Sequence, residues 1–259
     1  MKRTALITGA SSGFGLEFAH NFAKDGHGVV LVARSADKLE QLATELRSQY
    51  QVPVWVMPCD LSRMEAIEAL YADLQKQEIQ IDFLVNNAGF GDFAFFHEAD
   101  WQKIEQMIDL NIKALTKLSH FFAKEMKARG FGRILQVAST AAFQPGPLMA
   151  VYFATKAYVL YLGEAMNNEL QGTGVTVTNL CPGPAETGFQ QVANLADSKL
   201  IKGKKIPSAK EIADEGYKHL MKGSMTVIPG LANKIGANMV RFVPRKWVLS
   251  IVRKVQEKA

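Results

Sequence analysis

Tyr152 and Lys156 lie four residues apart, and Ser139 precedes them in the same stretch of chain. On a helix, residues at this spacing share one face, so the phenol and the ammonium would lie side by side. A cation favours phenolate over phenol, and at ~4 Å with an effective dielectric of ~20 it contributes roughly 4 kcal/mol. We therefore expect Tyr152 to have a lowered pKa and to act as an acid or base, with the Ser139 hydroxyl directed at the same substrate oxygen. A Tyr–Lys pair on a solvated helix face is the alternative.

A glycine-rich turn is the second feature with chemical meaning. The apolar run 4–8 leads into it and a helical pattern follows, and the turn reads Gly9-Ala10-Ser11-Ser12-Gly13-Phe14-Gly15. Gly9 permits a tight turn, Gly13 lets the backbone approach a pyrophosphate, and Gly15 allows close contact between helix and strand. The N–H groups of the first helical turn would face the anion. The motif predicts a dinucleotide site, and a glycine turn without a ligand is the alternative.

Arg34 follows the next apolar run, 28–33, about twenty residues beyond the glycine turn. An acidic residue there would accept hydrogen bonds from the ribose hydroxyls of NAD. Ala33 and Arg34 occupy this position instead, so no carboxylate repels a 2′-phosphate there, and Arg34 supplies a cation for it. The sequence favours NADP(H), against the alternative of a solvated arginine at a strand end.

Strand-like and helix-like segments alternate along the chain and would position these residues. We expect strands at 4–8, 28–33, 54–57, 81–85, 133–138, 175–180 and 225–228. Ser62 and Glu65 have the spacing of a capping box, which predicts a helix from there to about residue 77. The alternation predicts a single-domain α/β, Rossmann-like doubly wound fold over residues 1–259, with about seven parallel strands and helices on both faces. Ligands bind such sheets at the carboxyl ends of the strands, where all the candidate residues from Gly9 to Thr187 lie.

Three segments between these elements have less regular patterns. Asn111 interrupts the helical pattern of residues 101–129, and asparagine is unfavourable inside a helix. Residues 90–96 are rich in phenylalanine and glycine, and they either face a substrate or pack against a neighbouring subunit. Residues 184–207 show no periodicity, so we expect a mobile substrate loop there.

Composition excludes several classes of function. The 259 residues contain two cysteines and five histidines without metal-ligand spacing, so we expect neither a disulfide framework nor a metal site. The sequence shows no apolar run long enough for a signal peptide or a membrane span, which predicts a cytoplasmic protein. The net charge is +5, but residues 234–259 hold seven Lys/Arg and one Glu, a local charge of +6. The rest of the chain carries a net charge of about −1, so the sequence does not support nucleic-acid binding by the main domain.

The basic C-terminal segment, residues 234–259, is amphipathic. Residues 245–255 predict a short helix in which basic side chains border Trp247 and several aliphatic residues. Such a helix can lie on a membrane surface. Docking onto the domain or onto a partner subunit is the other interpretation, and the one we favour from sequence.

Taken together, these motifs strongly resemble the short-chain dehydrogenase/reductase family over roughly residues 4–190. The resemblance is carried by the glycine turn after Thr8 and by Asn86-Asn87-Ala88-Gly89, Asn111, Ser139, Tyr152-x-x-x-Lys156 and Pro182-Gly183 with Thr187. It implies a homodimer or homotetramer with a small-molecule carbonyl or alcohol as substrate.

The resemblance also implies roles for single residues. Tyr152 would be the general acid or base, Lys156 would lower its pKa and bind the nicotinamide ribose, and Ser139 would hold the substrate oxygen. Asn111 would anchor a water that relays protons to Lys156. The cofactor contacts would come from the glycine turn and from Arg34, Asp60, Leu61, Asn87, Gly89, Tyr152, Lys156, Pro182, Gly183 and Thr187.

The function expected from these residues is NADP(H)-dependent reduction of an aldehyde or ketone to an alcohol, or the reverse reaction. Two alternatives remain open. One is a non-catalytic NADP(H)-binding redox sensor that uses the same pocket. The other is a peripheral membrane reductase for lipid-like carbonyls, which rests on the C-terminal segment alone.

Overall fold

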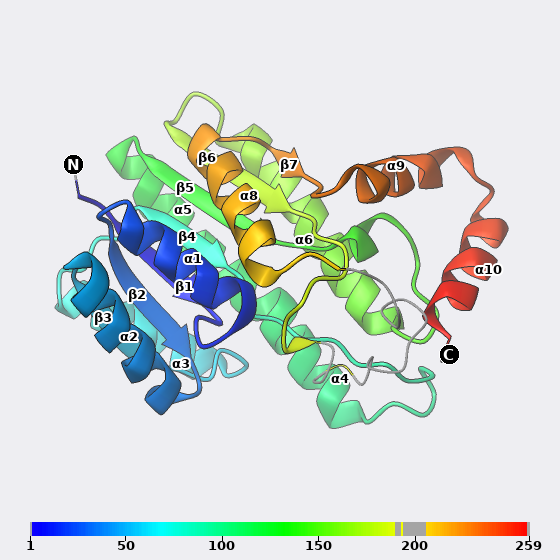
Figure 1. The fold of residues 1–259 in the computed structure, drawn as a ribbon, viewed down its shortest axis with the longest axis horizontal. Helices are drawn as coiled ribbons and strands as arrows, with labels where there is room; N and C mark the ends of the chain where they lie inside the picture. The colour runs from blue at the N-terminus through cyan, green and yellow to red at the C-terminus, as the bar shows by residue number, and fades with distance from the viewer. Residues whose placement is uncertain (1, 190–192, 194–205, 258–259) are drawn as a thin grey trace.

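The computed structural model describes residues 2–189, 193 and 206–257. Within them a parallel sheet of seven strands is covered by helices on both faces (Figure 1). The strands are β1 (Thr4–Thr8), β2 (Gly28–Ala33), β3 (Val54–Pro58), β4 (Phe83–Asn86), β5 (Gly132–Val137), β6 (Val175–Leu180) and β7 (Thr226–Val227). This architecture confirms the predicted doubly wound α/β fold.

The helices follow the strands in the expected alternation. They are α1 (Gly13–Lys24), α2 (Ala36–Tyr50), α3 (Met64–Lys76), α4 (Trp101–Ile108), α5 (Leu115–Arg129), α6 (Ala150–Glu169), α8 (Ala209–Lys222), α9 (Leu231–Met239) and α10 (Arg245–Gln256). A π-helical segment, η1 (Asp109–Ala114), joins α4 to α5. Two short 3-10 turns, η2 (Thr140–Phe143) and η3 (Val240–Phe242), precede α6 and α10.

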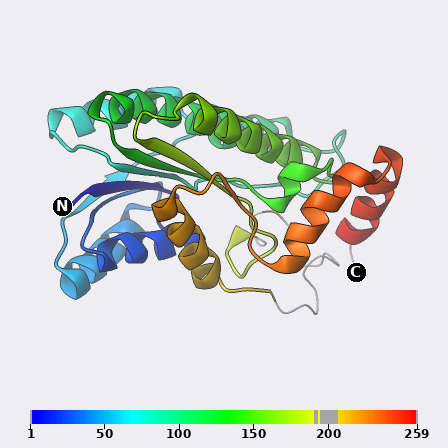
Figure 2. The ribbon, with the colours of Figure 1, turned by 90° about the horizontal axis from the view of Figure 1, so that it is seen from above.

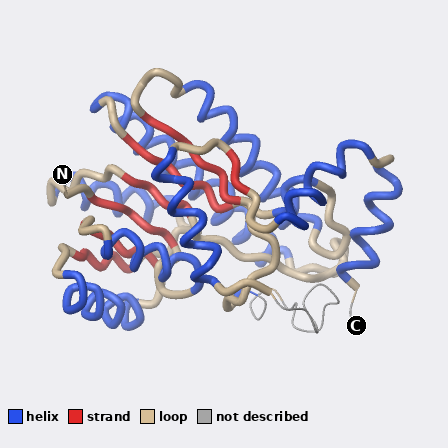
Figure 3. The backbone as a smooth tube through the Cα atoms, turned by 45° about the horizontal axis from the view of Figure 1, so that its top comes forward, coloured by secondary structure: helices blue, strands red, loops and turns tan. Residues whose placement is uncertain are grey.

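The strand order is β3-β2-β1-β4-β5-β6-β7, and every pair is parallel. The chain builds outward from β1 to β3 and then returns to the other side of β1 with β4. In open α/β sheets this reversal point is where ligands bind, beyond the carboxyl ends of the strands. Helices α9 and α10 lie past that same end of the sheet (Figure 3).

Helices lie on both sides of the sheet in the view from above (Figure 2), and two apolar layers hold them to it. Helices α1, α2 and α8 cover one face with a cluster that includes Phe18, Phe22 and Leu46. The other face carries a cluster from α3 and α5, with Leu74 and Phe122 among its buried members. The central strands are buried on both faces, which explains their continuous apolar runs.

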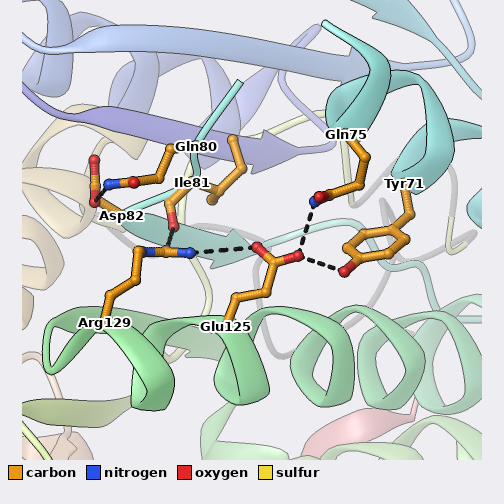
Figure 4. Close-up of polar contacts among 7 residues, drawn as sticks. All are labelled: Tyr71, Gln75, Gln80, Ile81, Asp82, Glu125 and Arg129. Carbon is orange, nitrogen blue, oxygen red and sulfur yellow. Dashed lines mark hydrogen bonds and ion pairs between the residues drawn. The ribbon is translucent and has the colours of Figure 1, made fainter. Parts of the chain in front are cut away.

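A polar clamp joins α3 to α5 and to the chain before β4 (Figure 4). The Glu125 carboxylate accepts hydrogen bonds from the Tyr71 hydroxyl and, at 2.8 Å, from the amide of Gln75. Arg129 contacts the same carboxylate at 3.4 Å and donates to the carbonyl of Ile81 at 2.6 Å. The clamp fixes α5, the helix that follows η1, and η1 carries Asn111.

Two local predictions need correction, and a third falls mostly on residues that the structure does not describe. The capping box at Ser62 and Glu65 is wrong, because α3 begins at Met64 and its N-cap, Arg63, makes no side-chain cap bond. The Ser62 hydroxyl donates instead to the carboxylate of Asp60 at 2.8 Å. The last strand is shorter than expected, with two residues in β7, and the predicted mobile loop at 184–207 lies mostly outside the described residues.

The C-terminal segment forms two helices, of which the sequence predicted one. Helix α10 matches the amphipathic stretch, and α9 precedes it. Within the described part of the chain, none of the helices combines the length and apolar character needed to cross a bilayer.

Candidate functional site

Ser139 and Tyr152 meet beyond the end of β5. Ser139 has extended backbone (φ −173°) and begins η2, and its oxygen accepts a hydrogen bond from the N–H of Ala141 at 3.1 Å. Tyr152 lies in the first turn of α6, where it is buried, and its side chain hydrogen-bonds that of Ser139. The two hydroxyls therefore share one small region.

Lys156 lies one turn further along the same face of α6 and is also buried. Its Nζ donates to the backbone carbonyl of Val137 at 2.7 Å and lies 5.8 Å from the centre of the Tyr152 ring. A buried ammonium needs such a partner, because an unpaired one is strongly disfavoured.

The expectation that Tyr152 has a lowered pKa is wrong for the structure described here. Burial raises the pKa of Tyr152 to about 12, and the hydrogen bond with Ser139 only partly opposes this. Burial likewise lowers the pKa of Lys156 to about 8. In both cases desolvation disfavours the charged form, and it outweighs the attraction assumed from the helical spacing.

Asn111 occupies the π-helical segment η1 and is buried. Its amide donates to the carbonyl of Phe90 and to the hydroxyl of Thr155, and its oxygen accepts from the N–H of Phe90 at 3.1 Å. Thr155 in turn donates to the carbonyl of Tyr152 at 2.7 Å. Asn111 therefore joins the 90–96 loop to α6, and π-helical insertions of this kind are frequent at functional sites.

Gly89 separates Asn111 from Lys156. A Cβ atom at Gly89 would lie 3.0 Å from the Asn111 side-chain oxygen and 3.5 Å from Lys156 Nζ. The absence of a side chain there lets both polar groups approach the strand end. The need for this close approach gives a direct reason for glycine at position 89.

The glycine turn has the backbone that the motif requires. Gly9 and Gly13 have φ of +67° and +55°, in the left-handed region that favours glycine. A Cβ at Gly15 would collide with the carbonyl of Gly9, so α1 can lie against β1 only with glycine there. Asn87 donates its amide to the carbonyl of Thr8 at 2.9 Å and so braces the turn.

The start of α1 fits an anionic group. Its N-cap, Ser12, makes no side-chain cap bond, and the first turn contains no acidic residue. The N–H groups of that turn are thus left for an external acceptor. Thr187 lies opposite, since a Cβ at Gly13 would be 3.4 Å from its side chain. The tertiary structure therefore places Thr187, four residues after Gly183, beside Gly13 of the glycine turn.

Arg34 and Asp60 lie at the ends of β2 and β3. Arg34 is exposed. Burial would raise the pKa of Asp60, but hydrogen bonds from Ser62 together with the charges of Arg34 and Arg63 hold this pKa below its usual value. The cation that the sequence assigned to a 2′-phosphate is therefore near the predicted adenine contact.

The remaining predicted cofactor residues differ in exposure. Leu61 is buried in the core and Phe14 packs against the α1 side of the sheet, so each contributes structure. Ser11 is half-buried beside the turn. Pro182 accepts a hydrogen bond from the Ser139 hydroxyl at 3.4 Å, and Gly183 packs closely against Asn233 of α9.

Sequence reasoning missed two positioning residues, Thr8 and Thr155. The Thr8 hydroxyl accepts from the N–H groups of Asn87 and Ala88 and thus links β1 to the chain after β4. Both threonines stand next to motif residues, which is the only sequence signal that could have indicated them. Their partners are distant in the chain.

An apolar cluster surrounds Tyr152. Phe90 and Phe93 pack against it, whereas Phe95 and Phe96 are exposed. The other members are Met107, Ala141, Met149, Phe153, Phe189, Ala193, Val151 and Val252. Val252 comes from α10, so the C-terminal segment does dock onto the domain, beside the site.

A family model described as short chain dehydrogenase matches residues 3–197. The chain belongs to the short-chain dehydrogenase/reductase family. Among curated relatives of this dehydrogenase/reductase is sulfoacetaldehyde reductase from Chromohalobacter salexigens, 35% identical over 226 residues that cover 84% of this chain and 87% of that protein. The chain is thus an oxidoreductase of this family.

Two solved structures extend the likeness over almost the whole dehydrogenase/reductase chain. A short-chain dehydrogenase from Sphingobium yanoikuyae in complex with NADPH is 32% identical, with a TM-score of 0.84 and 98% of each chain covered. A 7beta-hydroxysteroid dehydrogenase is 28% identical, with a TM-score of 0.87, covering 97% of this chain and 96% of that one. Both likenesses include the region of α9 and α10.

Proposed function

We propose that this chain is an NADP(H)-dependent oxidoreductase that reduces an aldehyde or ketone to an alcohol, or catalyses the reverse. The observation that carries the proposal is the convergence of Ser139, Tyr152 and Lys156 in one buried region. A buried phenol that keeps its proton is suited to donate it to a carbonyl oxygen. A redox sensor would need only the dinucleotide site and none of these groups.

NADPH, when bound, would supply the hydride. For the substrate, Ser139 and Tyr152 would hold the carbonyl oxygen between their hydroxyls, and Tyr152 would donate its proton there. A phenol with a pKa of about 12 is a weak acid at neutral pH. Lys156 must therefore stabilise the phenolate that forms, and its buried position, 5.8 Å from the ring centre, supports that role.

Reprotonation of Tyr152 would pass through Lys156. Asn111 is the residue proposed to anchor a relay water. Its amide joins Phe90 to Thr155, and its oxygen accepts one hydrogen bond, from the N–H of Phe90, which leaves a second lone pair for that water. Gly89 leaves the gap between Asn111 and Lys156. Removal of the Asn111 amide should therefore disturb the relay and the placement of α6 together.

For the cofactor, the glycine turn would hold the pyrophosphate and Arg34 the 2′-phosphate. The positive φ angles at Gly9 and Gly13, the uncapped start of α1 and the exposed Arg34 support this assignment. Asp60 and Leu61 would border the adenine, Asn87 its ribose, and Thr187 the carboxamide. The NADPH complex of the Sphingobium relative is consistent with the choice of NADP(H).

The substrate would carry an apolar substituent. The groups around Tyr152 are phenylalanine and methionine side chains, and a hollow beside it is lined by Met107, Met149 and Phe96. These apolar side chains suit a bulky substrate, such as the steroid in the name of the 7beta-hydroxysteroid dehydrogenase, better than a small sulfonated aldehyde such as sulfoacetaldehyde. A homodimer or homotetramer and a cytoplasmic location stay predictions.

A panel of apolar ketones, short aldehydes and sulfonated aldehydes, followed by loss of NADPH absorbance, tests the function. The expected result is turnover with NADPH that is highest for apolar carbonyls and requires Tyr152. Tight NADPH binding without turnover on any carbonyl or alcohol would favour the redox sensor instead.

A further inference from the structure

The surface formed by residues 231–257, here called the tail surface, is not used by the proposed reaction. It comprises α9, η3 and α10, which lie together at one end of the molecule (Figures 1 and 2). On α9 the inner side is marked by buried Ala237 and half-buried Asn233. Leu231, Ile235 and Met239 recur every four residues on the opposite side and are all exposed. Helix α9 thus presents an apolar face to its surroundings.

The apolar face continues through η3 into α10. Phe242 is 80% exposed and Leu231 75%, so these side chains protrude and do not line a groove. On α10, Val248, Val252 and Gln256 form the inner stripe, and Trp247, Ile251 and Val255 form an exposed stripe next to it. Exposed apolar residues of this number on adjacent elements usually mark an interaction site.

The same surface is strongly basic. Its cations are Lys234, Arg241, Arg245, Lys246, Arg253 and Lys254, and the acidic residue within 231–257 is Glu257. Among the described residues, Arg253 is the member of this set with an ion pair, to Glu257 at 3.5 Å. The other five cations are exposed. A partner for the tail surface must therefore be both apolar and anionic.

We propose that the tail surface binds reversibly to anionic lipid bilayers. Protruding aliphatic and aromatic side chains can enter the acyl boundary while the flanking Lys and Arg meet anionic headgroups. Contact between two copies of this surface would bring like charges together, which is unfavourable. An acidic protein would need a pocket for each protruding side chain, whereas a fluid bilayer accepts them without one.

Flotation of the intact protein with vesicles tests the proposal without substrate or cofactor, so its result is independent of the proposed reaction. The vesicles are phosphatidylcholine alone or phosphatidylcholine mixed with phosphatidylglycerol. The expected result is flotation with the mixed vesicles that decreases as salt is raised. Equal recovery with and without vesicles, or equal binding to both lipid mixtures, would overturn the proposal.

Two sets of variants locate the contact. Arg241→Gln, Arg245→Gln and Lys246→Gln together should weaken binding to the mixed vesicles on the order of 100-fold. The control is Lys38→Gln, Lys124→Gln and Lys127→Gln, which removes three exposed charges elsewhere and should leave most of the affinity.

A separate variant and its control test the apolar contribution to vesicle binding. Phe242→Ser with Trp247→Ser should reduce binding roughly tenfold or more. Its control is Trp101→Ser in α4, a tryptophan as exposed as Trp247. Equal losses in the control and tail variants would overturn the assignment. So would a tail variant that keeps its vesicle affinity but changes the oligomer's mass, because the surface would then be a contact between copies.

Discussion

The Nζ atom of Lys156 donates a hydrogen bond to the backbone carbonyl oxygen of Val137 at 2.7 Å. Val137 is the last residue of β5, and Ser139 follows two positions later. The lysine therefore fastens α6 to the strand end that carries the serine. The separation of Tyr152 from Ser139 depends on this bond, so Lys156 has a positioning effect in addition to its charge.

The pH dependence of cofactor binding should report Lys156. Burial lowers its pKa to about 8, so the amine is charged below that pH and neutral above it. NADPH affinity, measured by fluorescence titration, and kcat/KM should both fall as pH rises through about 8. Lys156→Arg keeps its charge and should remove this step from the binding curve, whereas Tyr158→Phe should retain it. An unchanged step in Lys156→Arg would contradict the assignment.

Replacement of Tyr152 by Phe should nearly abolish turnover. Loss of a general acid reduces rates by about 10²–10⁴-fold, and here kcat should fall with little change in NADPH affinity. Tyr158→Phe is the matched control, because Tyr158 lies on the same helix but is exposed. Steady-state kinetics with the best carbonyl substrate would measure both. Activity that survives in Tyr152→Phe would exclude the mechanism.

Cofactor preference should depend on Arg34. Arg34→Ala should weaken the binding of NADPH by roughly tenfold or more, because a charge-assisted contact worth about 1.5–3 kcal/mol is lost. NADH affinity should change little. Lys38→Ala removes an exposed charge nearby on α2 and serves as the control. If NADPH and NADH lose affinity equally, Arg34 does not contact the 2′-phosphate.

Gly89 should tolerate no side chain. A Cβ there would lie 3.0 Å from the Asn111 oxygen and 3.5 Å from Lys156 Nζ, so Gly89→Ala must displace one of them. We expect a marked fall in kcat with the fold intact by circular dichroism. Gly236→Ala, where a Cβ meets nothing within 4 Å, should be neutral. Full activity in Gly89→Ala would show that the relay geometry is unnecessary.

The clamp between α3 and α5 should contribute to stability. Tyr71→Phe removes the hydroxyl bonded to Glu125 and should lower the free energy of unfolding by about 1 kcal/mol. Tyr161→Phe, at an exposed position on α6, is the control. Urea denaturation followed by fluorescence would measure the difference. An equal effect of both variants would mean that the clamp adds nothing.

Much of the fold could be predicted from local patterns, because buried parallel strands read as apolar runs and glycine turns mark their ends. The capping box at Ser62 failed for a local reason as well: a serine next to Asp60 has a competing acceptor two residues away. Thr8 and Thr155 could not be predicted, since their partners come from segments distant in the chain.

The sequence by itself determined the order of strands and helices, and which polar residues follow the strand ends. It also determined that Tyr152 and Lys156 share one helix face. The tertiary structure decided the direction of their pKa shifts, because desolvation depends on side chains such as Met107 and Phe189 that only folding brings near. It likewise decided which side of the C-terminal helices stays exposed. Periodicity shows that a face is apolar, but only contacts show whether it is covered.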